Sequence, residues 1–293
     1  MAVSGAPNPT RPTEPHPLDG VPPSALVVEP RAHKRALGNF RKMGCFICSQ
    51  DDWHAYLVGL LLLCEGVGFL LVVPPPGEWF SYLVLGSLLL GGLACLLLSV
   101  WIDPGIVPPA PAAATPRAPE LRTLNGVPTM CKVCPTCHII RPPYSTHCQF
   151  CDVCVEEFDH HCRILGCCVA KRTYRFFAGI FIMRSGLLSY IIARTVVRLS
   201  YPESVGDWDS GQNSWIAIVA CLAAALVEAI FVFPISYRYI KMALFRTTYK
   251  LSLRDLSVFY VHSRPYRENL CYNCLRRFFG PLGKSQIDKD YYV

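Results

Sequence analysis

The sequence predicts an all-α polytopic membrane protein with four transmembrane helices and a cysteine-rich domain between the second and the third. Hydrophobic residues make up 52% of the 293 residues, and the mean hydropathy is +0.30. These residues gather in long blocks instead of being spread as in a soluble core. In addition, nine of the sixteen cysteines lie in one polar stretch, Cys131–Cys168, which separates two pairs of apolar blocks.

Four apolar segments are long enough to cross a bilayer, whose core requires roughly 20 residues of helix. They are His54–Val73, Trp79–Trp101, Phe176–Leu199 and Ser214–Tyr237. The first and the fourth each contain one acidic residue, Glu65 and Glu228, and the third contains Arg184. Arg184 and Glu228 lie at matching depths, so we predict an interhelical ion pair, with Glu65 as a second candidate partner.

The distribution of charge predicts the orientation. The connections PPPGE and SYPESVGDWDSGQNS contain no Lys or Arg, whereas the other extramembrane parts are basic. By the positive-inside rule, both termini and the cysteine-rich loop face the cytosol. The net charge of +7 then indicates attraction to an anionic lipid bilayer and no nucleic-acid partner. Golgi, endoplasmic reticulum and plasma membrane all stay open as locations.

The expected domains follow from these boundaries. They are a Pro-rich, basic N-terminal tail (1–53), transmembrane helices 1 and 2 (54–101), a cysteine-rich domain (102–175), transmembrane helices 3 and 4 (176–237), and a C-terminal tail (238–293). The tail and the cysteine-rich domain are expected to be cytosolic, where clustered cysteines are more often metal ligands or reactive thiols than disulfides.

A doubled spacing sorts the cysteines of this domain. The pattern Cys134-x2-Cys137-x9-His147-x6-Cys154 recurs fourteen residues later as Cys148-x2-Cys151-x9-His161-x6-Cys168. Three cysteines and one histidine suit a tetrahedral structural zinc ion, so the sequence predicts two interleaved zinc sites. Metal binding would supply much of the folding energy of a stretch with little apolar core. Two alternatives stay open: Cys167 could replace Cys168 by a one-residue slip, and Cys131 could compete for the first metal.

The repeat leaves Asp159, His160 and Cys162 unassigned, side by side. Zinc ligands flank Cys162 on both sides and would fix its backbone. His160 can accept the thiol proton, and Asp159 can orient the imidazole and stabilise its charged form. We therefore predict that Cys162 is a nucleophile, and that local positive charge favours its thiolate.

These residues resemble the Asp-His-His-Cys (DHHC) family of integral-membrane protein S-acyltransferases, the palmitoyltransferases. The resemblance includes Asp103–Gly105 after the second segment, RPPYSTHC, the pair Thr247 and Thr248 after the fourth segment, and Asn273 in the tail. It implies that a long-chain acyl-CoA such as palmitoyl-CoA acylates Cys162. The acyl group then passes to membrane-proximal cysteines of protein substrates. The resemblance also implies that Thr248 supports the catalytic aspartate.

The resemblance further suggests contacts for the CoA phosphates, at Lys171, Arg172 and Arg175, although ordinary positive-inside charge would also account for these residues. The chain departs from the family pattern where Arg163-Ile164 follows DHHC in place of Pro-Trp, and where Lys250 replaces a glutamate. These departures support an alternative function, a catalytically weak or inactive membrane scaffold or accessory protein of the same fold.

Overall fold

The structure is a computed structural model that describes residues 37–43, 46–49, 52–72, 78–110, 118–124, 127–200, 213–245, 248 and 269–287. The expectations for the Pro-rich tail up to residue 36, for Thr247, for Lys250 and for most of the two weakly charged connections lie outside the described residues.

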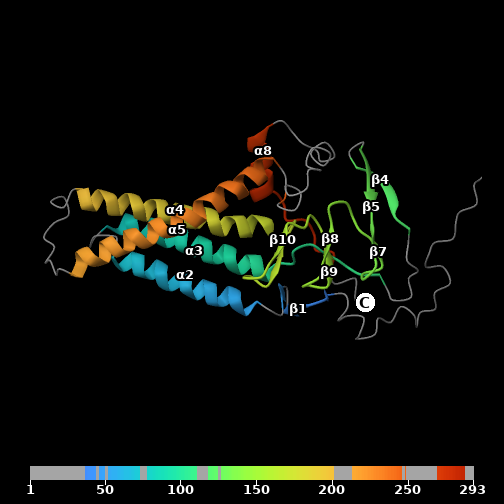
Figure 1. Cartoon of the computed structure of the whole chain (residues 1–293), viewed down its shortest axis with the longest axis horizontal. Coiled ribbons are helices and arrows are strands. Elements are labelled where there is room, and N and C mark those ends of the chain that lie inside the picture. The colour runs from blue at the N-terminus through green and yellow to red at the C-terminus, as the bar shows by residue number, and fades with distance from the viewer. Residues whose placement is uncertain are drawn as a thin grey trace, which may run out of the picture.

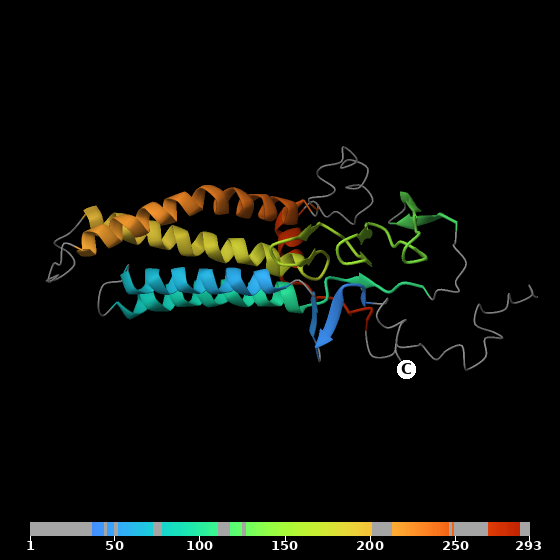
Figure 2. The same cartoon turned by 60° about the horizontal axis from the view of Figure 1, so that its bottom comes forward.

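Four long helices form the body of the molecule. They are α2 (Trp53–Val72), α3 (Trp79–Trp101), α4 (Tyr174–Ser200) and α5 (Asn213–Leu244). They lie side by side, with α2 and α3 on one side of the bundle and α4 and α5 on the other (Figures 1 and 2). All four are long and apolar enough to cross a membrane, which confirms the predicted fold class.

The helix ends agree with the predicted segments except at the end of α5. That helix continues beyond Tyr237 to Leu244 and includes the basic residues Arg238 and Lys241. Apolar length predicts where a helix can cross a bilayer, whereas backbone hydrogen bonding carries the helix further into the polar region.

Arg184 joins three of the helices inside the bundle. Its guanidinium contacts the carboxylate of Glu228 on α5 and lies 2.5 Å from the carboxylate of Glu65 on α2. The Arg184 side chain is only 7% exposed. The structure therefore contains the predicted ion pair between Arg184 and Glu228. Arg184 also pairs with Glu65, the second candidate partner. A charge at this depth requires such partners because lipid offers none.

The cysteine-rich region folds into short antiparallel strands at one end of the bundle. The described strands are β1 (Phe40–Met43), β2 (Phe46–Ser49), β3 (Ile106–Val107), β4 (Glu120–Leu124), β5 (Val127–Cys131), β6 (Val133–Cys134), β7 (Ile139–Ile140), β8 (Thr146–Cys148), β9 (Val153–Val155), β10 (His160–Cys162) and β11 (Cys167–Val169). They pair as β1–β2, β4–β5, β6–β7, β10–β11 and the three-stranded sheet β3–β9–β8. β10 lies next to the helices, β8 lies farther away, and β4, β5 and β7 lie farther still (Figure 1).

Two peripheral elements pack against this region. The β1–β2 hairpin precedes α2, and Asn39 just before it donates its backbone N–H to the Cys151 carbonyl at 2.9 Å. Gly38 has a φ of +54°, and a Cβ there would lie 2.1 Å from the same carbonyl oxygen. Only glycine fits this close approach. At the other end of the chain, α8 (Leu270–Phe279) packs against α5 and buries Asn273.

We predict that replacing Glu228 and Glu65 together by glutamine destabilises the protein by more than the two single changes combined. Each single change leaves Arg184 one carboxylate and so costs less than the roughly 3–5 kcal/mol of breaking a buried pair outright. Thermal unfolding of the purified protein in detergent measures the effect. Glu78→Gln is the control. It removes the carboxylate of a more exposed ion pair, Glu78 with Arg194, and should change the melting temperature little. A double variant that melts like wild type would contradict the bracing role.

Candidate functional site

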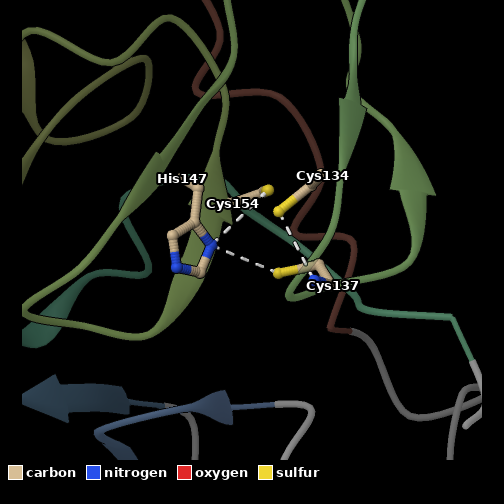
Figure 3. Close-up of side chains that lie close together, drawn as sticks. All are labelled: Cys134, Cys137, His147 and Cys154. Carbon is tan, nitrogen blue, oxygen red and sulfur yellow. Dashed lines mark hydrogen bonds between the residues drawn. The ribbon is translucent and has the colours of Figure 1, made fainter. Parts of the chain in front are cut away.

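The first group of predicted metal ligands converges on one point. The sulfurs of Cys134, Cys137 and Cys154 and a ring nitrogen of His147 all lie within 4.8 Å of one another. Figure 3 shows the four side chains pointing inward, with His147 and Cys154 coming from the β8–β9 pair and the two other cysteines from β6 and the turn after it. His147 Nδ1 lies 3.4 Å from Cys137 Sγ and 4.0 Å from Cys154 Sγ.

The second group has the same form. It contains Cys148, Cys151, His161 and Cys168. His161 Nδ1 lies 3.5, 3.3 and 3.8 Å from the three sulfurs, in that order along the chain. A tetrahedral ion with bonds of about 2.0–2.3 Å would separate its ligands by roughly 3.5–3.8 Å. Both groups fit such an ion, so both clusters could bind a metal ion.

A carboxylate lies on the outer side of the first cluster. Asp152 Oδ1 lies 3.6 Å from His147 Nε2, the ring nitrogen that does not face the sulfurs, and this distance is too long for a hydrogen bond.

The pairing of β10 with β11 determines which side chains reach the second cluster. The register sets His161 opposite Cys168, and Cys162 opposite Cys167. Successive side chains of a strand point to opposite faces. His161 and Cys168 therefore share the face of the metal cluster, while His160 and Cys162 face the other way.

The two alternative ligands, Cys167 and Cys131, lie outside both groups. Cys167 is buried, but its thiol donates to the Ser99 carbonyl at 3.4 Å, outside the second cluster. Cys131 is buried at the end of β5 and belongs to neither cluster. The structure thus groups the eight side chains as the repeat predicts and leaves Cys167 and Cys131 outside both groups, and the ligand assignment itself stays a prediction.

The three predicted catalytic residues lie together on the face away from the metal cluster. His160 Nδ1 lies 2.9 Å from Asp159 Oδ2, and the Asp159 side chain is fully buried. The His160 side chain is 26% exposed, and Cys162 is partly exposed. The His160 ring packs edge-on against Phe177 in the first turn of α4, at 5.1 Å between centroids. The site therefore sits where the cysteine-rich region meets the helix ends.

Hydrogen bonds within this group determine its protonation. Burial disfavours the charged form of His160, but hydrogen bonds with Asp159 and Cys162 outweigh it and raise the pKa of His160 to about 9. Burial likewise acts to raise the pKa of Cys162, yet the hydrogen bonds from His160 and from the Leu165 backbone N–H outweigh it, and the pKa of Cys162 is lowered. The arrangement favours a thiolate beside an imidazolium. Sequence reasoning missed the backbone donor, because residue identity does not reveal where an N–H points.

The Asp103–Gly105 motif anchors the region to α3 and to the tail. Asp103 Oδ1 accepts the backbone N–H groups of Gly105 and Ile106, each at 2.9 Å. Asp103 Oδ2 accepts from the Arg172 guanidinium and from the Ser285 hydroxyl, each at 2.6 Å. One buried carboxylate thus links α3, the segment before α4 and the chain after α8.

The residues expected at the CoA phosphates have internal partners. Arg172 binds Asp103, Lys171 Nζ lies 2.7 Å from the Glu156 carboxylate, and Arg175 donates to the Gly280 carbonyl. Among these three, Lys171 is the most exposed, and the CoA contact stays a prediction for all of them. Thr248 is buried, and its supporting role likewise stays a prediction.

Comparison with known proteins agrees with the site. A family model described as DHHC palmitoyltransferase matches residues 129–253, which include both clusters and the Asp159–Cys162 tetrad. Palmitoyltransferase ZDHHC14 of Mus musculus is 31% identical over 252 residues, which cover 75% of this chain and 48% of that protein.

Two other relatives have similar identity and similar names. Palmitoyltransferase ZDHHC18 of Rattus norvegicus is 31% identical, with 69% of this chain and 58% of the relative covered. Probable protein S-acyltransferase 6 of Arabidopsis thaliana is 29% identical, with 66% and 52% covered. The chain thus spans about half of the length of these curated relatives. The family model covers both clusters and the Asp159–Cys162 tetrad, and the relatives have palmitoyltransferase or S-acyltransferase names, so the chain belongs to the DHHC palmitoyltransferase family.

Proposed function

We propose that this chain is a protein S-acyltransferase that moves a long-chain acyl group, such as palmitate, from acyl-CoA to Cys162 and then to cysteines of substrate proteins at the cytosolic face of a membrane. The observation that carries the proposal is the Asp159–His160 hydrogen bond beside a partly exposed thiol, at the junction of the strands and the helix ends. The names of the relatives, which are palmitoyltransferases and an S-acyltransferase, support the same reaction.

The first step uses His160 as the base. Because His160 Nδ1 is engaged by Asp159, its Nε2 is left to take the Cys162 proton. The thiolate attacks the thioester carbonyl of acyl-CoA, the bond from carbonyl carbon to CoA sulfur breaks, and CoA leaves with the proton from His160. Asp159 holds the ring in the required tautomer and stabilises its positive charge.

The second step repeats the proton transfer on a new thiol. His160 deprotonates the cysteine of the substrate protein, whose sulfur attacks the acyl carbon on Cys162. The thioester bond to Cys162 breaks, and the Cys162 thiolate regains its proton from His160. The reaction is therefore a ping-pong transfer through an acyl-enzyme.

We infer that the two clusters hold structural zinc. Zinc would take all eight side chains as ligands and fix the backbone on both sides of Cys162 without taking part in the transfer. The three-cysteine, one-histidine donor set is typical of such closed sites.

The proposed orientation places the cysteine-rich end in the cytosol, where acyl-CoA is expected. Lys171 is the first candidate for a CoA phosphate because its flexible side chain is 44% exposed. Arg172 and Arg175 are second candidates. The acyl chain would enter the bundle beside Phe177, whose ring adjoins His160.

Metal content tests the ligand assignment with two neighbouring cysteines. We predict that Cys168→Ser lowers the zinc content from about two ions to about one per chain, because it removes a ligand of the second site. Cys167→Ser should retain both ions. Elemental analysis of purified protein measures both variants. Equal zinc in the two variants, or loss from Cys167→Ser alone, would show that the ligand set is wrong.

Acyl labelling tests the nucleophile. Incubation with alkyne-labelled palmitoyl-CoA should give a hydroxylamine-sensitive label that disappears in Cys162→Ser, since serine offers no thiol at this position. Cys271→Ser, which removes an exposed thiol on α8, should keep the label. If zinc-loaded wild-type protein takes up no label, the proposed activity is wrong, and the scaffold function gains support.

Replacing Asp159 should lower the rate of acyl transfer without disturbing the fold. Asp159→Asn should lower the rate of CoA release by roughly 10²–10⁴-fold, because His160 loses the partner that fixes its tautomer. The zinc content should stay at the wild-type value, which separates loss of catalysis from loss of fold. Glu120→Gln, which changes an exposed carboxylate on β4, provides the control. Unchanged CoA release in Asp159→Asn would remove this residue from the mechanism.

A further inference from the structure

A second thiol faces Cys162 across the β10–β11 hairpin. Cys167 is its directly opposite partner in the antiparallel register. Side chains at opposite positions share one face, and their Cβ atoms lie about 4.5–5.5 Å apart. A disulfide requires Cα atoms roughly 4.4–6.8 Å apart and Cβ atoms at about 3.5–4.5 Å. The backbone of this hairpin is therefore close to the geometry of a cross-strand disulfide.

Cys167 does not belong to the second cluster. The second group is complete with Cys148, Cys151, His161 and Cys168, whose ligand atoms already lie within 4.8 Å of one another. The Cys167 thiol instead donates to the Ser99 carbonyl at the end of α3, a contact that a small side-chain rotation would break.

The two thiols differ in access. Cys162 is partly exposed, whereas Cys167 is only 2% exposed and lies behind it against α3. An accessible thiol in front of a protected one is the arrangement of a redox-sensitive cysteine with its resolving cysteine.

We propose that Cys162 and Cys167 form a reversible disulfide when the protein meets a peroxide, and that this bond blocks acylation of Cys162. The formation of the bond stands on the hairpin alone, whereas its effect on acylation rests on the proposed function. Because an acylated Cys162 has no free thiolate, loading with the acyl group protects the site, and oxidation and acylation compete for one sulfur.

The chemistry balances with hydrogen peroxide as the oxidant. The Cys162 thiolate attacks one peroxide oxygen, the O–O bond breaks, and the departing hydroxide takes up a proton to become water, leaving a sulfenic acid. The Cys167 sulfur then attacks the Cys162 sulfur, the S–O bond breaks, and water leaves with the Cys167 proton. The two thiols lose two electrons in total, and a dithiol reductant restores them.

Peptide mapping tests the bond directly. Zinc-loaded protein in detergent is treated with hydrogen peroxide, its free thiols are alkylated, and it is digested without reduction for mass spectrometry. The expected product is a Cys162–Cys167 linkage that dithiothreitol removes while both zinc ions stay bound. Prior incubation with palmitoyl-CoA should lower its yield. Oxidation of Cys162 to sulfinic acid without this linkage, or linkages only among the metal ligands, would overturn the proposal.

Two variants make the test specific. Cys48→Ser removes another buried thiol, on β2, and the Cys162–Cys167 linkage should persist in this variant. A linkage that depends on Cys48 would overturn the assignment. In Cys167→Ser, peroxide should drive Cys162 to sulfinic acid, so that dithiothreitol restores acyl labelling at least about tenfold less than in wild type. Full recovery in Cys167→Ser would also contradict the proposal. If wild type forms the linkage but never accepts an acyl label, the proposed function fails and the disulfide stands.

Discussion

The alternation of side chains along β10 is the constraint on which the site depends. His160, His161 and Cys162 are consecutive in this strand. The side chain of the middle residue therefore points to the opposite face from the side chains of its two neighbours. His161 therefore joins the second metal cluster with Cys168, while His160 and Cys162 share the opposite face with Asp159 behind them. One three-residue strand thus separates the candidate metal ligands from the candidate nucleophile and its base, so the Cys162 sulfur lies near the second cluster without belonging to it.

The surrounding contacts hold this strand against the helix ends. Asp103 connects α3 to Arg172 and to Ser285, which lies 182 residues further along the chain. Thr173 donates its hydroxyl to the Cys168 carbonyl, so the start of α4 is linked to a residue of the second cluster. A shift of the helices would therefore move the residues of the second cluster and, through β10, Cys162. This coupling connects the helix bundle to the hairpin that carries the candidate nucleophile, Cys162.

Local patterns could be predicted from the sequence, and long-range contacts could not. The doubled Cys–His spacing predicted both Cys–His clusters, because residues with such short spacings have few ways to converge on one point. The four apolar blocks predicted the helices, because bilayer thickness sets their length. The choice between Cys167 and Cys168 depended on the hairpin register, and spacing alone left it open. The pairing of Arg172 with Asp103, and the packing of Gly38 and Asn39 on Cys151, bring together segments that no local pattern connects.

Native mass spectrometry of the protein with palmitoyl-CoA tests the central claim most directly, since one spectrum counts metals and acyl groups on the same molecule. The account predicts a species that gains the mass of one acyl group while it keeps two zinc ions. It also predicts that fragmentation places the acyl group on the peptide that contains Cys162. An acylated species that has lost a zinc ion, or an acyl group found on a cluster cysteine, would contradict the separation of ligand and nucleophile.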